Sequence, residues 1–292
     1  MSLPKELLAQ LSRLKLQSKS CFSSKFKGEH QSTMHGSGLE FADYRAYQPG
    51  DELSHVDWNL YARSGRSFVK VFQFESDLTV SLLIDGSISM DFGTPKKIDL
   101  ARNIALALSY VVLNNSDHVQ LYACQENLTP ISSAIYGLPE FFHLSASAMA
   151  GLSNLGSLDL AACLQQFTEL NQPGLVILIS DFFDHSAYQD MLTLLVGQKF
   201  EVILIQILSS EELDPDLSGE AQLVDVETQK SKDVSVTQRS LSTYRKNLEH
   251  FLNQIQNFCQ KHSITYLQTN NQNSLEQIIL EDLRKVGLID TI

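Results

Sequence analysis

From residue 68 onward, apolar runs of strand length alternate with longer amphipathic stretches. Alternating apolar and polar residues predict a half-buried strand at 68–75, and short apolar runs predict strands at 78–84, 119–124, 128–135, 175–180, 202–208 and 264–268. Apolar residues at helical spacing predict helices at 97–113, 138–150, 158–169, 186–197, 240–261 and 274–286. Strands that alternate with crossover helices predict an α/β fold, with a mostly parallel sheet covered by helices on both faces.

The first 66 residues follow a different pattern. Leucines at helical spacing predict a helix over residues 1–17, and a polar stretch follows to residue 38. Residues 39–66 are dense in Asp, Arg, Tyr and Gly, and Gln48-Pro49-Gly50-Asp51 predicts a turn. We therefore expect an N-terminal helix and packed segment over 1–66, followed by a sheet domain over 67–292. A polar stretch at 209–238 predicts a hairpin inserted into that domain.

Composition narrows the class of protein. Hydrophobic residues make up 43% of the chain and charged residues 19%, which is typical of a globular protein. The net charge of −12 disfavours binding to nucleic acid. The four cysteines are not paired at metal-ligand spacing, which indicates a reducing compartment. Because the longest apolar run is shorter than the roughly 18–20 residues that span a bilayer, we expect a soluble, cytoplasmic protein without direct membrane insertion.

Two predicted strands end in residues that can bind a cation. Asp85-Gly86-Ser87-Ile88-Ser89 follows the strand at 78–84, and Asp181 follows the strand at 175–180. Ligand sites in such sheets lie beyond the carboxyl ends of the strands, so these residues are expected at one edge. Mg²⁺ prefers oxygen ligands and keeps several waters, which fits Asp85, Ser87 and Ser89 with Asp181 acting through water. The same pattern is also an ordinary turn and helix cap.

The motif in this position resembles the metal-ion-dependent adhesion site (MIDAS) of von Willebrand factor A domains. Further segments resemble the bacterial family named domain of unknown function 58, in the same order along the chain. They are Gly38-Leu39-Glu40-Phe41, Asp43-Tyr44-Arg45, Gln48-Pro49-Gly50-Asp51, Asp57-Trp58, Ala62-Arg63, Val69-Lys70-Val71-Phe72, Ile179-Ser180-Asp181-Phe182 and Leu223-Val224-Asp225-Val226. The resemblance covers residues 35 to 288 and implies a von Willebrand A-like fold with bound Mg²⁺ or Mn²⁺.

The sequence departs from the adhesion motif in its third loop. The family's usual Gly-x-Thr-Asp is replaced by Gly156-Ser157-Leu158-Asp159. Leu158 has no oxygen with which to bind a metal, and Ser157 is one position early and suited to capping the next helix. Dependence on a threonine ligand is therefore not expected here.

The charged block at 39–66 offers a second set of candidates. We interpret Arg45, Asp51, Asp57 and Arg63 as a buried charge network that holds this block on the sheet domain, with Trp58 as its apolar anchor. A phosphate loop at residues 35–38 is the alternative, although no predicted strand precedes it and no helix follows it.

Three functions follow from these features. The resemblance implies a non-catalytic interaction module that acts as adaptor or co-chaperone of a MoxR-type AAA+ ATPase. A hydrolase that uses Asp85 and a metal is the second possibility, but a dehalogenase-type phosphatase would need a second Asp where Ser87 stands, and only His185 lies near the predicted site. The third is a structural scaffold that binds no metal.

Overall fold

The computed structural model describes residues 3–18, 39–51, 53–74, 78–153, 155–184, 186–215, 219–224 and 231–291. The chain forms two compact units. Residues 1–19 and 78–292 form the first, which we call the sheet unit, and residues 20–77 form the second, the inserted unit. This division differs from the predicted boundary at residue 67, because the N-terminal helix belongs to the sheet unit and the strand at 68 belongs to the inserted unit.

The sheet unit is built around a central sheet in the order β12-β9-β8-β4-β5-β6. Neighbours from β12 to β5 are parallel, while β6 and β7 pair with β5 in antiparallel fashion. The predicted α/β fold with a mostly parallel sheet is therefore confirmed. The strands are β4 (Thr79–Asp85), β5 (His118–Cys124), β6 (Leu128–Pro130), β7 (Ile135–Tyr136), β8 (Leu175–Ser180), β9 (Glu201–Leu208) and β12 (Thr265–Asn270).

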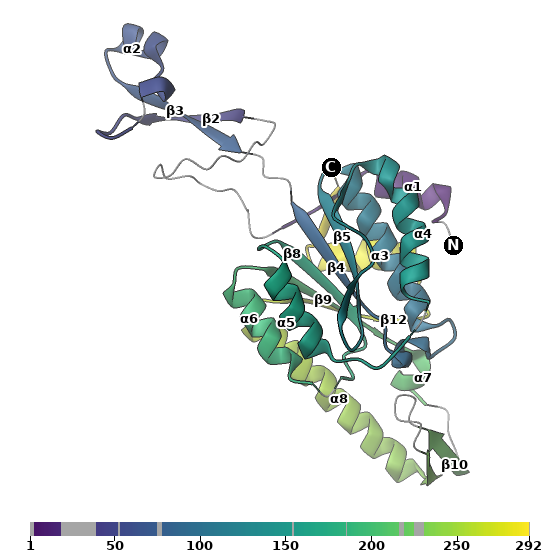
Figure 1. The fold of residues 1–292 in the computed structure, drawn as a ribbon. Coiled ribbons are helices and arrows are strands. Elements are labelled where there is room, and N and C mark those ends of the chain that lie inside the picture. The colour runs from purple at the N-terminus through teal and green to yellow at the C-terminus, as the bar shows by residue number, and fades with distance from the viewer. Residues whose placement is uncertain are drawn as a thin grey trace. The chain divides into compact units, whose positions relative to one another are not determined.

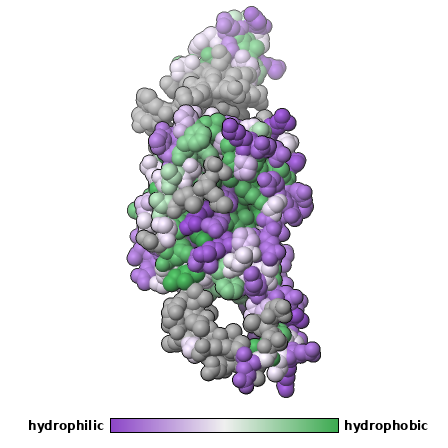
Figure 2. Space-filling model, turned by 90° about the vertical axis from the view of Figure 1, so that its right-hand side faces the viewer, coloured by the Kyte–Doolittle hydropathy of each residue, from purple (hydrophilic) through white to green (hydrophobic). Residues whose placement is uncertain are grey.

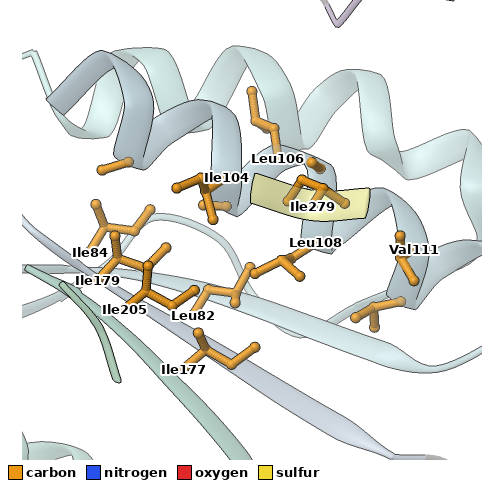
Figure 3. Packing of buried hydrophobic residues seen from close by; sticks show 14 of the residues in the cluster. Leu82, Ile84, Ile104, Leu106, Leu108, Val111, Ile177, Ile179, Ile205 and Ile279 are labelled. Atoms are coloured by element: carbon orange, nitrogen blue, oxygen red, sulfur yellow. The ribbon is translucent and has the colours of Figure 1, made fainter. Parts of the chain in front are cut away.

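Helices cover both faces of this sheet (Figure 1). Alternate residues of each strand point to opposite faces. Leu82 and Ile84 of β4 pack on one side with Ile104 of α3 (Figure 3). Leu83 packs on the other side. The first side carries α1 (Lys5–Leu11), α3 (Lys97–Asn114), α4 (Phe141–Gly151), α9 (Leu275–Gln277), a π turn (Ile278–Asp282) and α10 (Leu283–Lys285). The second carries α5 (Leu160–Leu170), α6 (Tyr188–Gly197) and α8 (Gln238–Lys261).

The two ends of the chain are held together by a small ribbon. The strand β1 (Leu14–Leu16) pairs antiparallel with β13 (Ile289–Thr291). The helix predicted over 1–17 therefore ends at Leu11, because Leu14 and Leu16 alternate with an exposed lysine and are buried as a strand. Leu11 is itself completely buried, which ties the N-terminal helix to the core of the sheet unit.

The segment predicted as an insertion forms a hairpin. After the short helix α7 (Ser210–Leu213), β10 (Gly219–Val224) pairs with β11 (Ser231–Val236). The first half of α8 projects away from the sheet, with this hairpin at the same end (Figure 1).

The inserted unit contains a two-stranded antiparallel sheet and one short helix among its described residues. The strand β2 (Leu39–Ala46) pairs with β3 (Phe68–Phe74), with a register shift between Phe41 and Asp43. The helix α2 (Trp58–Ser64) lies between them in sequence, after a 3₁₀ turn (Leu53–His55). The predicted strand at 68–75 therefore exists, but its partner is β2 and not the central sheet.

Apolar side chains also reach the surface of the sheet unit. Hydrophobic residues lie among polar ones on the side of the molecule where α4 lies (Figure 2). Phe142 of α4 is 73% exposed, although its neighbour Phe141 is buried against α3. The helix α4 therefore carries apolar residues on both its inner and its outer face.

Candidate cation site

The topology brings the ends of β4 and β8 together at the centre of the sheet. From β4 the chain continues to β5 on one side, whereas from β8 it continues to β9 on the other. Such a switch point leaves a crevice beyond the carboxyl ends of the two strands. Asp85 is the last residue of β4, and Asp181 directly follows β8. Both predicted carboxylates therefore flank this crevice.

The four predicted ligands form one connected group. The hydroxyl oxygens of Ser87 and Ser89 are 2.8 Å apart, and Ser89 Oγ donates to Asp181 Oδ2 at 2.8 Å. Asp85 accepts the backbone N–H of Ser87 at 2.8 Å and the hydroxyl of Ser180. The sequence therefore identified side chains that do meet, although it did not identify Ser180.

This group lies almost entirely below the surface. Asp85 and Ser87 are fully buried, Asp181 is 1% exposed, and Ser89 is half-buried. Burial first, and the charge of Asp181 second, raise the pKa of Asp85 to about 7, although hydrogen bonds from Ser180 and Ser87 oppose that rise. Asp85 thus carries its negative charge at a cost, which added positive charge would relieve.

A lysine that the sequence analysis did not identify completes the group. The Lys97 ammonium is fully buried and lies 2.7 Å from Asp181 Oδ2 and 2.5 Å from Glu212 Oε1. It also lies 5.6 Å from the ring centre of Phe183. The two carboxylates raise the pKa of Lys97 against the opposing effect of burial. The sequence contained one signal of this role. Lys97 is the first residue of α3, and a positive charge in the first turn of a helix is unfavourable unless a negative group pairs with it.

The turn after β8 is held in an unusual conformation. Phe182 is fully buried and has a φ of 61°, in the left-handed region that bulky residues rarely adopt. Three hydrogen bonds fix it: Phe182 N–H to Ser180 Oγ at 2.9 Å, Phe183 N–H to Asp181 Oδ1 at 3.0 Å, and Gln206 Nε2 to the Asp181 carbonyl at 2.7 Å. These bonds orient the Asp181 carboxylate toward Ser89 and Lys97.

The third loop lies beside the first. Gly156 N–H donates to the Gly86 carbonyl at 3.0 Å, and Ile88 N–H donates to the Gly156 carbonyl at 2.9 Å. The backbone of the third loop therefore supports the loop that carries Ser87 and Ser89.

The side chains of the third loop point elsewhere. Leu158 packs against the buried cluster beneath α5. The expected cap role of Ser157 belongs to Asp159, which accepts the N–H of Ala162 at 2.9 Å. Ser157 instead donates to Glu126 at 2.6 Å.

The residues predicted as a charge network lie in the inserted unit. Arg45 and Asp51 form an ion pair at 2.7 Å, but the Arg45 side chain is 44% exposed, so this pair lies at the surface. Asp57 caps α2 by accepting the Leu60 N–H at 2.9 Å. Trp58 is 58% exposed, and its role as an anchor stays a prediction.

Arg63 lies exposed in the last turn of α2. His185 and residues 35–38, the other candidates from the sequence, lie outside the described residues. Within the described ranges, no group of three or more His, Cys, Asp and Glu side chains is placed to hold a metal.

The parallel sheet, its switch point and Asp-x-Ser-x-Ser after the central strand define a von Willebrand A-like α/β domain. More specifically, the chain belongs to the family described as protein of unknown function DUF58, whose model matches residues 43–251. Among the helices that the structure describes, none combines the length and the apolar character needed to cross a membrane.

Similar proteins include an uncharacterized protein of Mycobacterium tuberculosis, 28% identical over 239 residues, or 79% of this chain and 74% of that protein. Among solved structures, the conserved hypothetical protein BatB from Bacteroides thetaiotaomicron is similar with a TM-score of 0.44 and 12% identity, over 72% of this chain and 98% of that one. A von Willebrand factor type A protein from Catenulispora acidiphila is similar with a TM-score of 0.35 and 19% identity, over 47% and 34%.

Proposed function

We propose that this protein is a non-catalytic interaction module that binds a partner through a divalent cation, Mg²⁺ or Mn²⁺, at the edge of its sheet. The observation that carries the proposal is a cluster of oxygen atoms next to the buried Asp85. Ser87 Oγ lies 2.8 Å from Ser89 Oγ, which lies 2.8 Å from Asp181 Oδ2. Asp85, Ser87 and Ser89 would hold the ion, and Asp181 would act through water.

The charges of the site suit an added cation. Asp85, Asp181 and Glu212 carry three negative charges when ionised, and Lys97 carries one positive charge, which leaves a charge of about −2 on three buried side chains and the 16% exposed Glu212. Serine ligands add no charge, so a divalent ion there would stay electrophilic. It would then accept a carboxylate from a partner, and the half-buried Ser89 marks the side of approach.

The described surroundings of the site favour binding over catalysis. Lys97 is engaged by two carboxylates, and Asp184 accepts the N–H of Leu160 at the start of α5. The Ser180 hydroxyl bonds to Asp85. Among the described residues, these groups are committed to positioning one another and not to moving a proton on a substrate. This supports an interaction module over a hydrolase.

The partner we propose is a MoxR-type AAA+ ATPase, with this protein as its adaptor or co-chaperone in the cytoplasm. The family resemblance supports this choice, and the net charge of −12 suits a basic face on the partner. The buried free cysteines Cys124, Cys163 and Cys259 suit a reducing compartment.

The cation is tested by calorimetric titration of Mg²⁺ and Mn²⁺ into chelator-treated protein. We expect saturable binding in the wild type, and binding weakened roughly tenfold or more in Ser89→Ala, because one oxygen ligand is lost. Ser109→Ala is the matched control, because Ser109 is a buried serine of α3 that bonds only within its own helix and should bind like the wild type. Wild-type protein that takes up neither ion contradicts the proposal and leaves the metal-free scaffold.

The partner is tested with a purified MoxR-type ATPase from the same organism. Binding should be measured in Mg²⁺ and in EDTA, for the wild type and for both serine variants. We expect EDTA and Ser89→Ala to weaken binding alike, whereas Ser109→Ala leaves it unchanged. Binding that is equal in Mg²⁺ and in EDTA contradicts a cation-bridged contact.

A further inference from the structure

The candidate site already contains a positive charge that belongs to the chain. The Lys97 side chain has no exposed surface, and its ammonium contacts Asp181 Oδ2 at 2.7 Å and Glu212 Oε1 at 2.5 Å. An unpaired buried charge is strongly unfavourable, so a buried ammonium needs a carboxylate in contact with it as counter-charge. Lys97 therefore neutralises Asp181, one of the residues proposed to serve the metal.

Lys97 and the proposed ligands use the same oxygen. Asp181 Oδ2 accepts both the Ser89 hydroxyl and the Lys97 ammonium. Since Ser89 is a proposed metal ligand, a divalent ion bound beside it would lie close to the ammonium. The positive charges of the ammonium and the divalent ion would then repel each other strongly, because the site is buried.

The loop before Lys97 is fixed by tight packing from a distant part of the chain. Gly93 has a φ of 90°, and a Cβ there would lie 2.5 Å from the Asn271 side chain and 2.8 Å from that of Ser209. Asn271 Nδ2 also donates to the Pro95 carbonyl at 2.6 Å. The start of α3 is thereby held against the segments after β9 and β12, which keeps Lys97 directed at Asp181.

We propose that Lys97 is the resident cation of this site, which neutralises Asp181 when no divalent ion is bound and lowers the affinity for such an ion by competing for that carboxylate. The competition rests on the proposed function, whereas the neutralisation does not and can be measured without metal. Lys97 thus sets the concentration of divalent ion at which the site fills.

The competition is tested by titrating Mn²⁺ into chelator-treated Lys97→Met. Methionine keeps the length and most of the volume of the side chain but removes its charge. We expect Mn²⁺ to bind roughly tenfold or more tightly than in the wild type, because the repulsion is gone. Lys96→Met is the matched control: this adjacent lysine is 52% exposed and pairs with Asp91 at the surface, so its loss should change affinity less than about twofold. Unchanged or weaker binding in Lys97→Met overturns the competition.

The neutralisation is tested by thermal unfolding in EDTA. Lys97→Met should lower Tm by roughly 10 °C, because Asp181 is left buried without its counter-charge, while Lys96→Met should change Tm little. Adding Asp181→Asn to Lys97→Met should restore part of the loss, and should also recover a folded protein if Lys97→Met alone does not fold. A double variant no more stable than Lys97→Met, or a Lys97→Met as stable as the wild type, overturns the proposal.

The two measurements separate this inference from the proposed function. If Mn²⁺ binds only to Lys97→Met, the wild-type chain is no metal-dependent module and the role of Lys97 as resident cation stands. If Mn²⁺ binds to neither protein, the proposed function and the competition both fail, and the EDTA experiment still decides whether Lys97 neutralises Asp181. If Mn²⁺ binds equally to both, the proposed function stands and the competition fails.

Discussion

At the scale of single residues, the candidate site joins the Asp85 and Asp181 carboxylates to the hydroxyls of Ser87 and Ser89, with the Lys97 ammonium beside Asp181. The sequence predicted Asp85 and Asp181 because each lies at the carboxyl end of a buried parallel strand, and parallel strand ends share an edge. Lys97 could not be placed in the same way. Its position depends on the packing of Gly93 against Asn271, which is 178 residues further along the chain (271 − 93), and no local pattern carries such a contact.

Asp85 makes the stability of the metal-free protein depend on pH. Its pKa is raised from 3.8 to about 7, so between those values the folded protein keeps a proton that the unfolded chain releases. The contribution of Asp85 to stability therefore falls as pH rises from about 4 to about 7, and this contribution is constant above that range. At pH 8 in EDTA, Asp85→Asn should accordingly be more stable than the wild type by about 2–4 kcal/mol, since one pKa unit corresponds to about 1.4 kcal/mol.

Urea unfolding of both proteins at pH 4.5 and pH 8 measures this effect. The difference between wild type and Asp85→Asn should shrink at the lower pH, where Asp85 is protonated in the folded state. If the two proteins differ in unfolding free energy by the same amount at both pH values, the pKa of Asp85 is not raised by burial.

At the scale of elements, the strands of the central sheet were predicted more closely than the ribbons. The strands β8 and β9 are buried along nearly all their length and consist mostly of apolar residues, with Gln206 as a buried polar residue inside β9. The three-residue strands β1 and β13 pair the two ends of the chain, and three residues are too few to show a period. The strand β2 was not predicted, because its charged residues obscure the apolar pattern that indicates a strand.

Three helix ends use the same turn without glycine. After α3, α6 and α8, one residue has a positive φ, and the backbone bonds of a Schellman motif close the turn. For α6, Lys199 N–H donates to the Val196 carbonyl at 3.0 Å and Phe200 N–H to the Leu195 carbonyl at 3.1 Å. The residues in the left-handed conformation are Ser116, Lys199 and Ser263. Glycine, the usual signal, is absent from the left-handed position, yet the apolar periodicity predicted helix ends at 113, 197 and 261, within one residue of the observed ends.

Glycine at these positions should stabilise the protein. Lys199→Gly removes the steric cost of the left-handed conformation while adding flexibility to the unfolded chain, for a net gain of about 0.5–1 kcal/mol. Ser116→Gly and Ser263→Gly should behave alike, and the three gains should add because the sites share no partners. Urea unfolding measures each gain.

Lys246→Gly provides the control for this prediction. Lys246 is an exposed lysine inside α8, where glycine should instead destabilise the protein by about 1 kcal/mol. Destabilisation by Lys199→Gly of similar size would mean that the left-handed turn is not the cause of strain at that position.

At the scale of the whole molecule, the described residues of the inserted unit contribute nothing to the two large buried clusters. Both clusters are formed by residues before 19 and after 77. The described inserted unit has one two-stranded sheet and one short helix, an arrangement that is marginal in isolation.

We therefore expect the sheet unit to fold without the inserted unit. Replacing residues 20–77 by a flexible Gly/Ser linker of about 20 residues should leave a cooperative thermal transition within a few degrees of the wild type, because the core is retained. Residues 20–77 produced alone should show no cooperative transition. Circular dichroism follows both, and a linker variant that melts without cooperativity would place part of the core's stability in the inserted unit.

Contacts around Glu212 connect the candidate site to the projecting part of α8. Glu212 belongs to the capping box that starts α7, and its carbonyl accepts the Tyr244 hydroxyl of α8 at 2.6 Å. Two residues on, Asp214 pairs with Arg245 at 2.6 Å. The projecting part of α8 thus holds the carboxylate that shares Lys97 with Asp181. A partner that bound this helix and shifted Glu212 would change the affinity of the proposed site for a cation. Thermodynamic reciprocity then requires the cation to change the protein's affinity for that partner by the same factor.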